Sequence, residues 1–233
     1  MHYVMSDLHG EYEKYIEMLK KIKFTDDDVL YVLGDVVDRG KHPIKILQDM
    51  MQRFNVYPLI GNHDYMCLLS LKTLLTEITN ESIEHFENED QLQMLQFWLQ
   101  EGGQTTLDEF MQLSKEEMQD IEDYLGEFSL YEEIHVNGKV FILVHAGLDN
   151  FNTARSLDDY ELYEVIFKRT NYTKVYYPDK YLVTGHTPTQ VIKGNSRPGF
   201  IYQKNHHIAI DCGCVFGGKL ACLCLETMEE FYV

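Results

Sequence analysis

Short polar motifs that directly follow short apolar runs constrain this chain more than any other feature of its sequence. They are SDLHG at 6–10, GDVVDRG at 34–40, GNHD at 61–64, HAG at 145–147 and GHT at 185–187. The apolar runs before them have the length and composition of buried strands. Because ligand sites form where the carboxyl ends of strands meet, we expect these Asp, His and Asn side chains to converge on one crevice.

The order of the remaining elements predicts an α/β fold. Strand-like apolar runs occupy residues 2–5, 29–33, 56–60, 131–136, 139–144, 181–184, 208–210 and 219–225. Between the first three runs, residues 12–22 and 44–51 repeat apolar side chains at helical spacing. Asn137-Gly138 separates two strand runs and is typical of a type I′ hairpin turn. No repeat or Pro/Gly/Ser-rich linker interrupts the chain, which predicts a single domain over residues 1–233.

The acidic charge of the chain is concentrated in one segment. Residues 77–133 hold 17 acidic side chains and one basic one, a balance of −16 within an overall charge of −18. Apolar residues from Met118 to Phe128 repeat at three and four positions, and Ser114 with Glu117 forms a capping-box sequence before them. We therefore predict an acidic helical insert at approximately 77–130, whose charge more often marks a solvated surface than a partner-binding face.

Composition excludes several classes of function. A charge of −18 repels nucleic-acid backbones and anionic lipids, so neither is an expected partner. No apolar run approaches the ~18 residues of a membrane span, and the N-terminus lacks the pattern of a signal peptide. Five cysteines without C-x-x-C spacing indicate neither a disulfide framework nor a zinc ribbon. These features predict a cytoplasmic protein.

The polar motifs supply oxygen and imidazole ligands without thiolates. Such a set suits Mn²⁺, Fe or Zn²⁺ and argues against a closed structural zinc site. Two divalent cations roughly 3.5–4 Å apart, sharing a carboxylate and a hydroxide, can promote in-line displacement at phosphorus. The predicted reaction is therefore phosphoester hydrolysis.

Taken together, the series DLHG, GDVVDRG, GNHD, HAG and GHTP resembles the metallophosphoesterase superfamily. GDVVDRG in particular resembles the PPP-type protein serine/threonine phosphatases, close to their bacterial and lambda-phage branch. The resemblance implies a β-sandwich flanked by helices. It also implies a phosphatase that hydrolyses small phosphomonoesters, or phosphoserine and phosphothreonine in proteins, by means of a hydroxide bridging two metal ions.

Matching motif to motif, the resemblance implies a set of metal ligands. Asp7, His9 and Asp35 would hold the first ion, and Asp35 would bridge to the second. Asn62, His145 and His186 would complete the second site. Mn²⁺ is the expected metal, with Fe or Zn²⁺ as alternatives.

The same matching implies roles for four further residues. His63 would be the general acid, with Asp38 fixing its tautomer. Arg39 and Arg169 would bind phosphate oxygens, for which the guanidinium fork is well shaped. Arg155 competes with Arg169 for that role.

Two alternatives to a protein phosphatase stay open. GNHD and HAG also resemble the symmetrical diadenosine tetraphosphate hydrolases, although those enzymes tend to lose the acid at Asp38. This resemblance implies diadenosine tetraphosphate or another nucleotide polyphosphate as the substrate. Ile60 occupies a position where phage-type phosphatases often have Arg, so one phosphate contact is missing. A non-catalytic, metal-stabilised binding module is disfavoured because it has no need of His63, Asp38 and Arg39.

Two further expectations concern the choice of substrate and the histidine and cysteine residues outside the motifs. An acidic insert beside the cleft would repel polyphosphates and attract basic phosphopeptides. His206 and His207 are interpreted as surface or edge residues, and the cysteines near the C-terminus as small packing residues.

Overall fold

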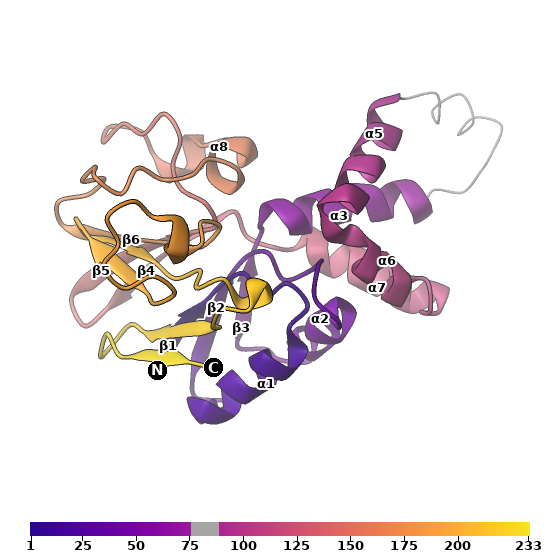
Figure 1. Ribbon diagram of the computed structural model, residues 1–233, viewed down its shortest axis with the longest axis horizontal. Helices are drawn as coiled ribbons and strands as arrows, with labels where there is room; N and C mark the ends of the chain where they lie inside the picture. Colours follow the sequence, from indigo (N-terminus) through magenta and orange to yellow (C-terminus); the bar gives the residue numbers. More distant parts are fainter. Residues whose placement is uncertain (76–88) are drawn as a thin grey trace.

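Two five-stranded sheets form the centre of the computed structural model, which describes residues 1–75 and 89–233 (Figure 1). The first sheet has the order β10-β9-β1-β2-β3 and the second the order β4-β5-β6-β8-β7. The strands of the first are β1 (His2–Met5), β2 (Val29–Leu33), β3 (Val56–Leu59), β9 (Ala221–Cys224) and β10 (Glu230–Tyr232). Those of the second are β4 (Tyr131–Val136), β5 (Lys139–Val144), β6 (Lys180–Thr184), β7 (Tyr202–Lys204) and β8 (His207–Ala209).

Apolar residues on both faces of the sheets explain the layered packing. Along β1, Val4 joins a core cluster that contains residues of both sheets, whereas Tyr3 and Met5 join the larger cluster shared with the helices. Phe141 and Ile142 divide between the same two clusters along β5. Each sheet therefore packs on the other with one face and on helices or loops with the other, and the predicted α/β sandwich flanked by helices is confirmed.

The parallel strands set the position of the polar motifs. β1, β2 and β3 are parallel neighbours in the first sheet, and β5 and β6 are parallel in the second. Their carboxyl ends lie at the same edge of the sandwich, where all five motifs begin. β4 and β5 form the expected antiparallel hairpin, with positive φ at Asn137 (49°) and Gly138 (74°).

Helices surround the sheets and extend to one side of them (Figure 1). They are α1 (Tyr12–Lys21), α2 (Pro43–Met51), α3 (Asn62–Leu75), α5 (Glu89–Trp98), α6 (Gln104–Phe110), α7 (Lys115–Gly126) and α8 (Leu162–Ile166). A kinked segment, η1 (Leu99–Gly103), in which Gly102 has a positive φ of 114°, joins α5 to α6. In the described parts, no helix has the length and apolar character needed to cross a membrane.

The predicted helical insert is confirmed from residue 89 onward, while its first part, 77–88, lies outside the described residues. Ser114 caps α7 as expected: its Oγ accepts from the Glu117 N–H (3.3 Å), and the Glu117 carboxylate accepts from the Ser114 N–H (2.8 Å). Ile121 and Leu125 are buried, so α7 uses its apolar stripe for packing.

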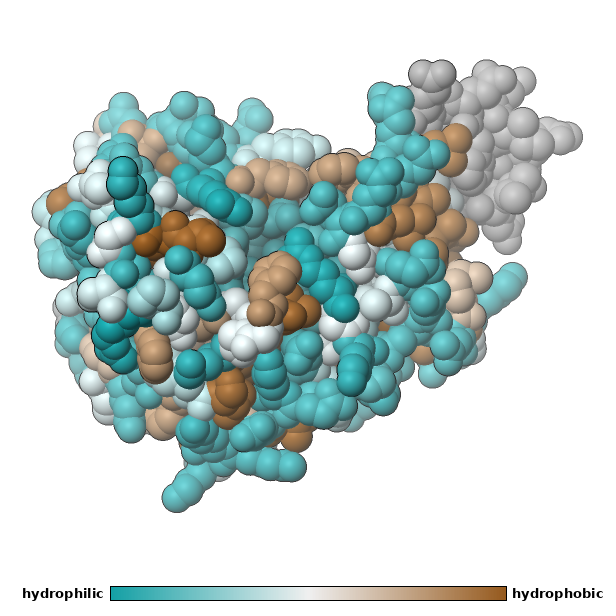
Figure 2. Space-filling model, in the orientation of Figure 1, coloured by the Kyte–Doolittle hydropathy of each residue, from teal (hydrophilic) through white to brown (hydrophobic). Residues whose placement is uncertain are grey.

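Hydrophilic side chains cover most of the molecular face shown in Figure 2, with hydrophobic ones scattered between them.

One expectation about local structure was wrong. His207 is buried, not a surface residue, because β8 lies between β6 and β7 and the His207 ring stacks on Tyr172 at 4.7 Å. His206 is exposed, as expected. Asn62 of the GNHD motif begins the helix α3. All five cysteines are unpaired and buried.

Candidate active site

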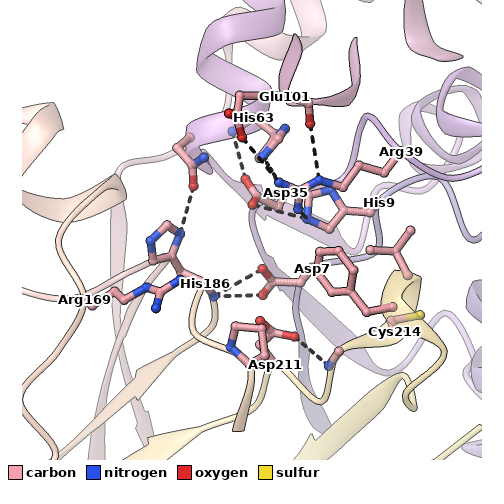
Figure 3. A pocket seen from close by; sticks show the side chains of 15 residues that line it. Asp7, His9, Asp35, Arg39, His63, Glu101, Arg169, His186, Asp211 and Cys214 are labelled. Carbon is pink, nitrogen blue, oxygen red and sulfur yellow. Dashed lines mark hydrogen bonds and ion pairs between the residues drawn. The ribbon is translucent and has the colours of Figure 1, made fainter. Parts of the chain in front are cut away.

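Residues of four of the five polar motifs line one pocket at the carboxyl edge of the sheets (Figure 3). Of the residues that the sequence singled out, those lining the pocket are Asp7, His9, Asp35, Arg39, Asn62, His63, Arg169 and His186. Asp38 and His145 lie directly behind them, fully buried. The structure also places Asp211, Glu101 and Phe216 at this pocket, which the motif pattern did not single out as site residues.

Left-handed backbone conformations bring these side chains together. Positive φ angles between 40° and 73° occur at Asp7, His9, Asp35, Asp38, Arg39 and His186. Non-glycine residues seldom adopt this region, and clusters of them mark strained functional sites. The neighbouring loops approach so closely that a Cβ at Gly61 would lie 2.3 Å from Asp35 Oδ1. Glycine at position 61 is therefore a steric requirement.

Asp35 lies between two groups of possible ligand atoms. One group is Asp35 with His9 and His63, the other is Asp35 with His145 and His186, and within each group the atoms lie within 4.8 Å of one another. His9 Nε2 is 3.5 Å from Asp35 Oδ2, and His145 Nε2 is 3.5 Å from Asp35 Oδ1. One carboxylate thus faces both groups with different oxygens, which is the arrangement needed for a bridging ligand.

Asn62 extends the second group, and Asp7 contacts the backbone of one of its members. Asn62 Oδ1 lies 3.0 Å from His145 Nε2 and 2.9 Å from His186 Nδ1, so it belongs to the second group. The Asp7 carboxylate is buried and accepts from the His186 backbone N–H at 3.0 Å. Burial raises the pKa of Asp7 well above its usual range, and the charges of Asp211 and Asp35 add to the effect.

Backbone carbonyls fix the orientation of two of the histidines. His9 Nδ1 is 2.9 Å from the Val37 carbonyl oxygen, and His145 Nδ1 is 2.7 Å from that of Leu33. Each Nδ1–H donates to its carbonyl, which leaves Nε2 as an acceptor that faces Asp35. Burial lowers the pKa of His9 to about 3 and also lowers that of His145, so both rings are neutral. Neutral imidazole is the form that binds metal.

These observations fit two divalent cations. The donor atoms are carboxylate, amide oxygen and neutral imidazole nitrogen, and one carboxylate is shared. Asp7, Asp35 and Asp211 crowd their charges into a buried site, and burial with that repulsion raises the pKa of Asp211 to about 6. Bound cations would neutralise this excess negative charge.

His63, a member of the first group, forms a buried pair with Asp38. His63 Nδ1 is 2.8 Å from Asp38 Oδ2, and the two side chains are 2% and 0% exposed. Burial lowers the pKa of His63, but the charges of Asp35 and Asp38 outweigh it and the net shift is upward. By distance alone His63 qualifies as a ligand, but its contact with Asp38 also suits a proton donor held in one tautomer.

The helical insert supplies the remaining partners of Asp38. Trp98 Nε1–H donates to both carboxylate oxygens, at 2.9 and 3.0 Å. Thr106 Oγ1 donates to Asp38 Oδ1 at 2.7 Å and accepts from the Asp38 backbone N–H at 2.9 Å. A Cβ at Gly103 would lie 2.4 Å from the Trp98 ring, so glycine is needed for the ring to fit. The polar motifs of the sequence include none of Trp98, Gly103 and Thr106.

The arginines occupy different environments. Arg39 donates to His9 Nε2 at 2.8 Å and to His63 Nε2 at 2.7 Å, and its backbone N–H donates to the Gly102 carbonyl at 3.0 Å. Arg169 lines the pocket. Arg155 lies elsewhere, paired with Glu164 at 2.5 Å and stacked over Tyr160. The geometry therefore favours Arg169 over Arg155 as a phosphate contact.

Asp64 joins the loops that carry Asp35 and Asn62. Its carboxylate accepts from the backbone N–H groups of Asp35 (2.7 Å), Val36 (2.9 Å), Val37 (3.3 Å) and Gly61 (2.9 Å). Burial, with the nearby charge of Asp35, raises the pKa of Asp64 to about 7. The residue aligns two ligand-bearing loops without facing the pocket.

One acidic residue of the described part of the insert lines the pocket. Among the described insert residues, Glu101 alone lines it, and Glu101 lies 4.0 Å from Arg39. The other acidic side chains of α5, α6 and α7 do not line it. Within the described part of the insert, Glu101 is therefore the one acidic side chain placed to act on a substrate in the pocket, and the expectation about substrate choice stays a prediction.

Two sheets whose strand ends carry paired ligand groups around a shared aspartate define a metallohydrolase. The calcineurin-like phosphoesterase family model matches residues 3–190. The chain belongs to this family, which implies binding of two divalent metal ions.

A named relative and two solved structures refine the comparison. The chain is 25% identical to the asymmetrical bis(5′-nucleosyl)-tetraphosphatase PrpE of Halalkalibacterium halodurans, over 97% of this chain and 90% of the relative. A solved structure provisionally identified as a diadenosine tetraphosphatase has a TM-score of 0.67 and 18% identity, covering 100% of this chain and 92% of its own. A protein serine/threonine phosphatase from Saccharomyces cerevisiae has a TM-score of 0.59 and 13% identity, covering 100% and 79%.

These comparisons correct the predicted subfamily. The superfamily is confirmed, but the named relative is a nucleotide tetraphosphatase, and the likeness to the yeast phosphatase extends to the fold alone. Assignment to the PPP-type protein phosphatases is therefore not supported.

Proposed function

We propose that this chain is a metal-dependent hydrolase of bis(5′-nucleosyl) tetraphosphates. The observation that carries the proposal is its similarity, over nearly its whole length, to a relative of that name. This favours the dinucleotide alternative over the phosphoprotein substrate that the motifs first indicated.

We assign the metal ligands as the sequence predicted. Asp7, His9 and Asp35 would hold one cation, and Asp35, Asn62, His145 and His186 the other. When bound, two such cations neutralise phosphoryl oxygens and acidify water at the reacting phosphorus. Mn²⁺ is our choice of metal because the donors are oxygen and imidazole.

The cationic residues give the site its affinity for a chain of phosphates. Arg39 and Arg169 would bind phosphate oxygens and orient the scissile bond. Arg169 also lines a second hollow of about 300 Å³, together with Lys168 and Lys174. Basic side chains that extend from the reacting centre to this second hollow suit a polyphosphate better than a single phosphate group.

We expect cleavage to be asymmetrical. Water would add to the phosphorus next to one nucleoside, so that a nucleoside monophosphate and a nucleoside triphosphate leave. Symmetrical cleavage would give two nucleoside diphosphates. The two outcomes differ only in which phosphate lies at the shared aspartate, Asp35.

Hydrolysis of phosphomonoesters is a second candidate function, favoured by the buried His63–Asp38 pair. An alkoxide leaving group needs a proton, whereas a nucleotide phosphate is a weaker base and departs more easily. A chain that holds Asp38 with Trp98 and Thr106 has retained the means to protonate an alkoxide. We therefore propose that alkyl phosphates are slower, additional substrates.

A substrate panel tests both functions. The Mn²⁺-loaded protein would be assayed on diadenosine tetraphosphate, an alkyl phosphate and a phosphoserine peptide, with products separated by chromatography and Asp35→Asn as the inactive control. We expect the highest kcat/KM for the dinucleotide, with AMP and ATP as products. Turnover of the phosphopeptide without hydrolysis of the dinucleotide would refute the proposal. A cytoplasmic location stays a prediction.

A further inference from the structure

An aromatic side chain stands at the mouth of the catalytic pocket. Phe216 lines the pocket together with Val215 and is 68% exposed. Single exposed hydrophobic residues are common on protein surfaces, so exposure alone carries no meaning. Phe216 differs from the others in its position beside the reacting centre and in the way it is held.

The turn that carries Phe216 is fixed at both ends. It is a short 3₁₀ turn, η4 (Cys214–Phe216), between Gly213 (φ 73°) and Gly217 (φ 80°). Asp211 Oδ1 accepts from the Gly213 N–H at 2.8 Å, and Lys14 Nζ donates to the Cys214 carbonyl at 2.8 Å. The Phe216 N–H closes the turn on the Gly213 carbonyl at 3.0 Å. The ring is thus presented to solvent by an anchored backbone.

The pocket is too small to enclose a nucleotide. Its volume is about 230 Å³, below the roughly 300–1,000 Å³ of pockets that bury a drug-sized ligand. Phosphate groups fit beside the ligand residues, but an attached nucleoside must lie at the mouth. The Arg39 guanidinium lies 5.3 Å from the centre of the Phe216 ring, so a phosphate contact and the aromatic ring are adjacent.

We infer that Phe216 is a stacking platform for the nucleobase of the substrate, with Arg39 binding the phosphates next to it. Every base offers a π face, so such a platform selects nucleotides over base-free phosphates without choosing among bases. The inference rests on the proposed function, because it supplies the contact that separates a dinucleotide from a simple phosphoester.

Two measurements on the Mn²⁺-loaded protein test the inference. Inhibition constants of ADP and pyrophosphate against p-nitrophenyl phosphate give the preference for a base, and calorimetry of ADP binding checks it without turnover. Removing a base-stacking aromatic ring weakens binding by about 5- to 100-fold. We expect Phe216→Ala to weaken ADP by that factor and to leave pyrophosphate unchanged.

Three further variants define what the ring contributes. Phe216→Trp should retain the preference for ADP, and Phe216→Leu should lose most of it because a leucine is apolar but has no π face. Phe54→Ala removes a ring that is 73% exposed and does not line the pocket, and it should change nothing.

The outcomes separate this inference from the proposed function. Equal weakening of ADP and pyrophosphate in Phe216→Ala, or a wild-type protein with no preference for ADP, would overturn the platform even if the dinucleotide is hydrolysed. Loss of ADP preference in Phe216→Ala supports it. If the wild type then fails to hydrolyse the dinucleotide, the proposed function is refuted and the platform stands.

Discussion

Replacing Trp98 with phenylalanine measures how far the helical insert supports proton donation by His63. The indole N–H donates to both oxygens of Asp38, a carboxylate that is 0% exposed and holds His63 Nδ1. Phenylalanine keeps an aromatic ring in the site but removes this donor. Asp38 is then free to turn toward Thr106, and His63 loses its fixed orientation.

The magnitude follows from the strength of the lost hydrogen bond. A hydrogen bond to a charged group contributes about 1.5–3 kcal/mol. If that free energy is expressed in the transition state, kcat for an alkyl phosphate falls by about 10- to 100-fold. p-Nitrophenolate departs without a proton, so kcat for p-nitrophenyl phosphate should fall much less, and metal content should not change.

The controls separate positioning from general damage. Phe97→Leu alters the neighbouring residue of α5, which is 48% exposed, and should leave both rates unchanged. Thr106→Val removes the other donor to Asp38 and should give the same dependence on leaving group. Combining Trp98→Phe with His63→Asn should cost no more than His63→Asn alone, since both act on one proton transfer. Equal losses on both substrates, or additive losses in the double variant, would refute the reasoning.

Three further predictions concern the metal centre, the arginines and Asp64. Chelation should abolish activity, and Mn²⁺ should restore it. Asp35→Asn should be nearly inactive, and elemental analysis should show that it binds less metal. Full activity of a verified metal-free preparation would contradict the assignment. Arg169→Ala should raise KM and weaken inhibition by phosphate, whereas Arg155→Ala should do neither. Inhibition kinetics measure both effects, and an effect of Arg155→Ala without one of Arg169→Ala would contradict this choice of arginine. Asp64→Asn places an amide among backbone N–H donors and should lower the free energy of unfolding by about 3 kcal/mol. Calorimetry should show a fall in Tm of about 6–12 °C. Asp108→Asn, at an exposed position, is the control.

The sequence predicts those parts of the fold that depend on local pattern. The strands at 2–5, 29–33 and 139–144 have the predicted bounds, because an apolar run that ends in a polar, glycine-containing motif marks both ends of a buried strand. The convergence of Asp7, Asp35 and His186 follows from the same pattern, since parallel strands end at one edge.

Features that depend on distant neighbours could not be predicted in this way. Buried residues cover most of the helix α3 (Asn62–Leu75), and Tyr65, Leu69 and Lys72 lie on its less buried face, so its apolar residues form no narrow stripe. Trp98 and Thr106 reach Asp38 across 60 and 68 residues of chain. His207 is buried only because β7 and β6 flank its strand. Each of these required the tertiary arrangement to be known.

The left-handed backbone conformations at the pocket lower the stability of the fold but position the side chains of the site. A non-glycine residue in this region costs roughly 1–2 kcal/mol relative to glycine, and Arg39 and His186 lack the short side chain that eases the strain in aspartate. Glycine at either position would relax the backbone and, in the same step, remove a proposed phosphate contact or a proposed metal ligand. A selection for heat resistance alone would therefore accumulate inactive variants, and a lineage freed from its reaction would drift toward glycine at these sites. Thermostable versions of this enzyme are better sought in α1, α2 and the exposed face of α7.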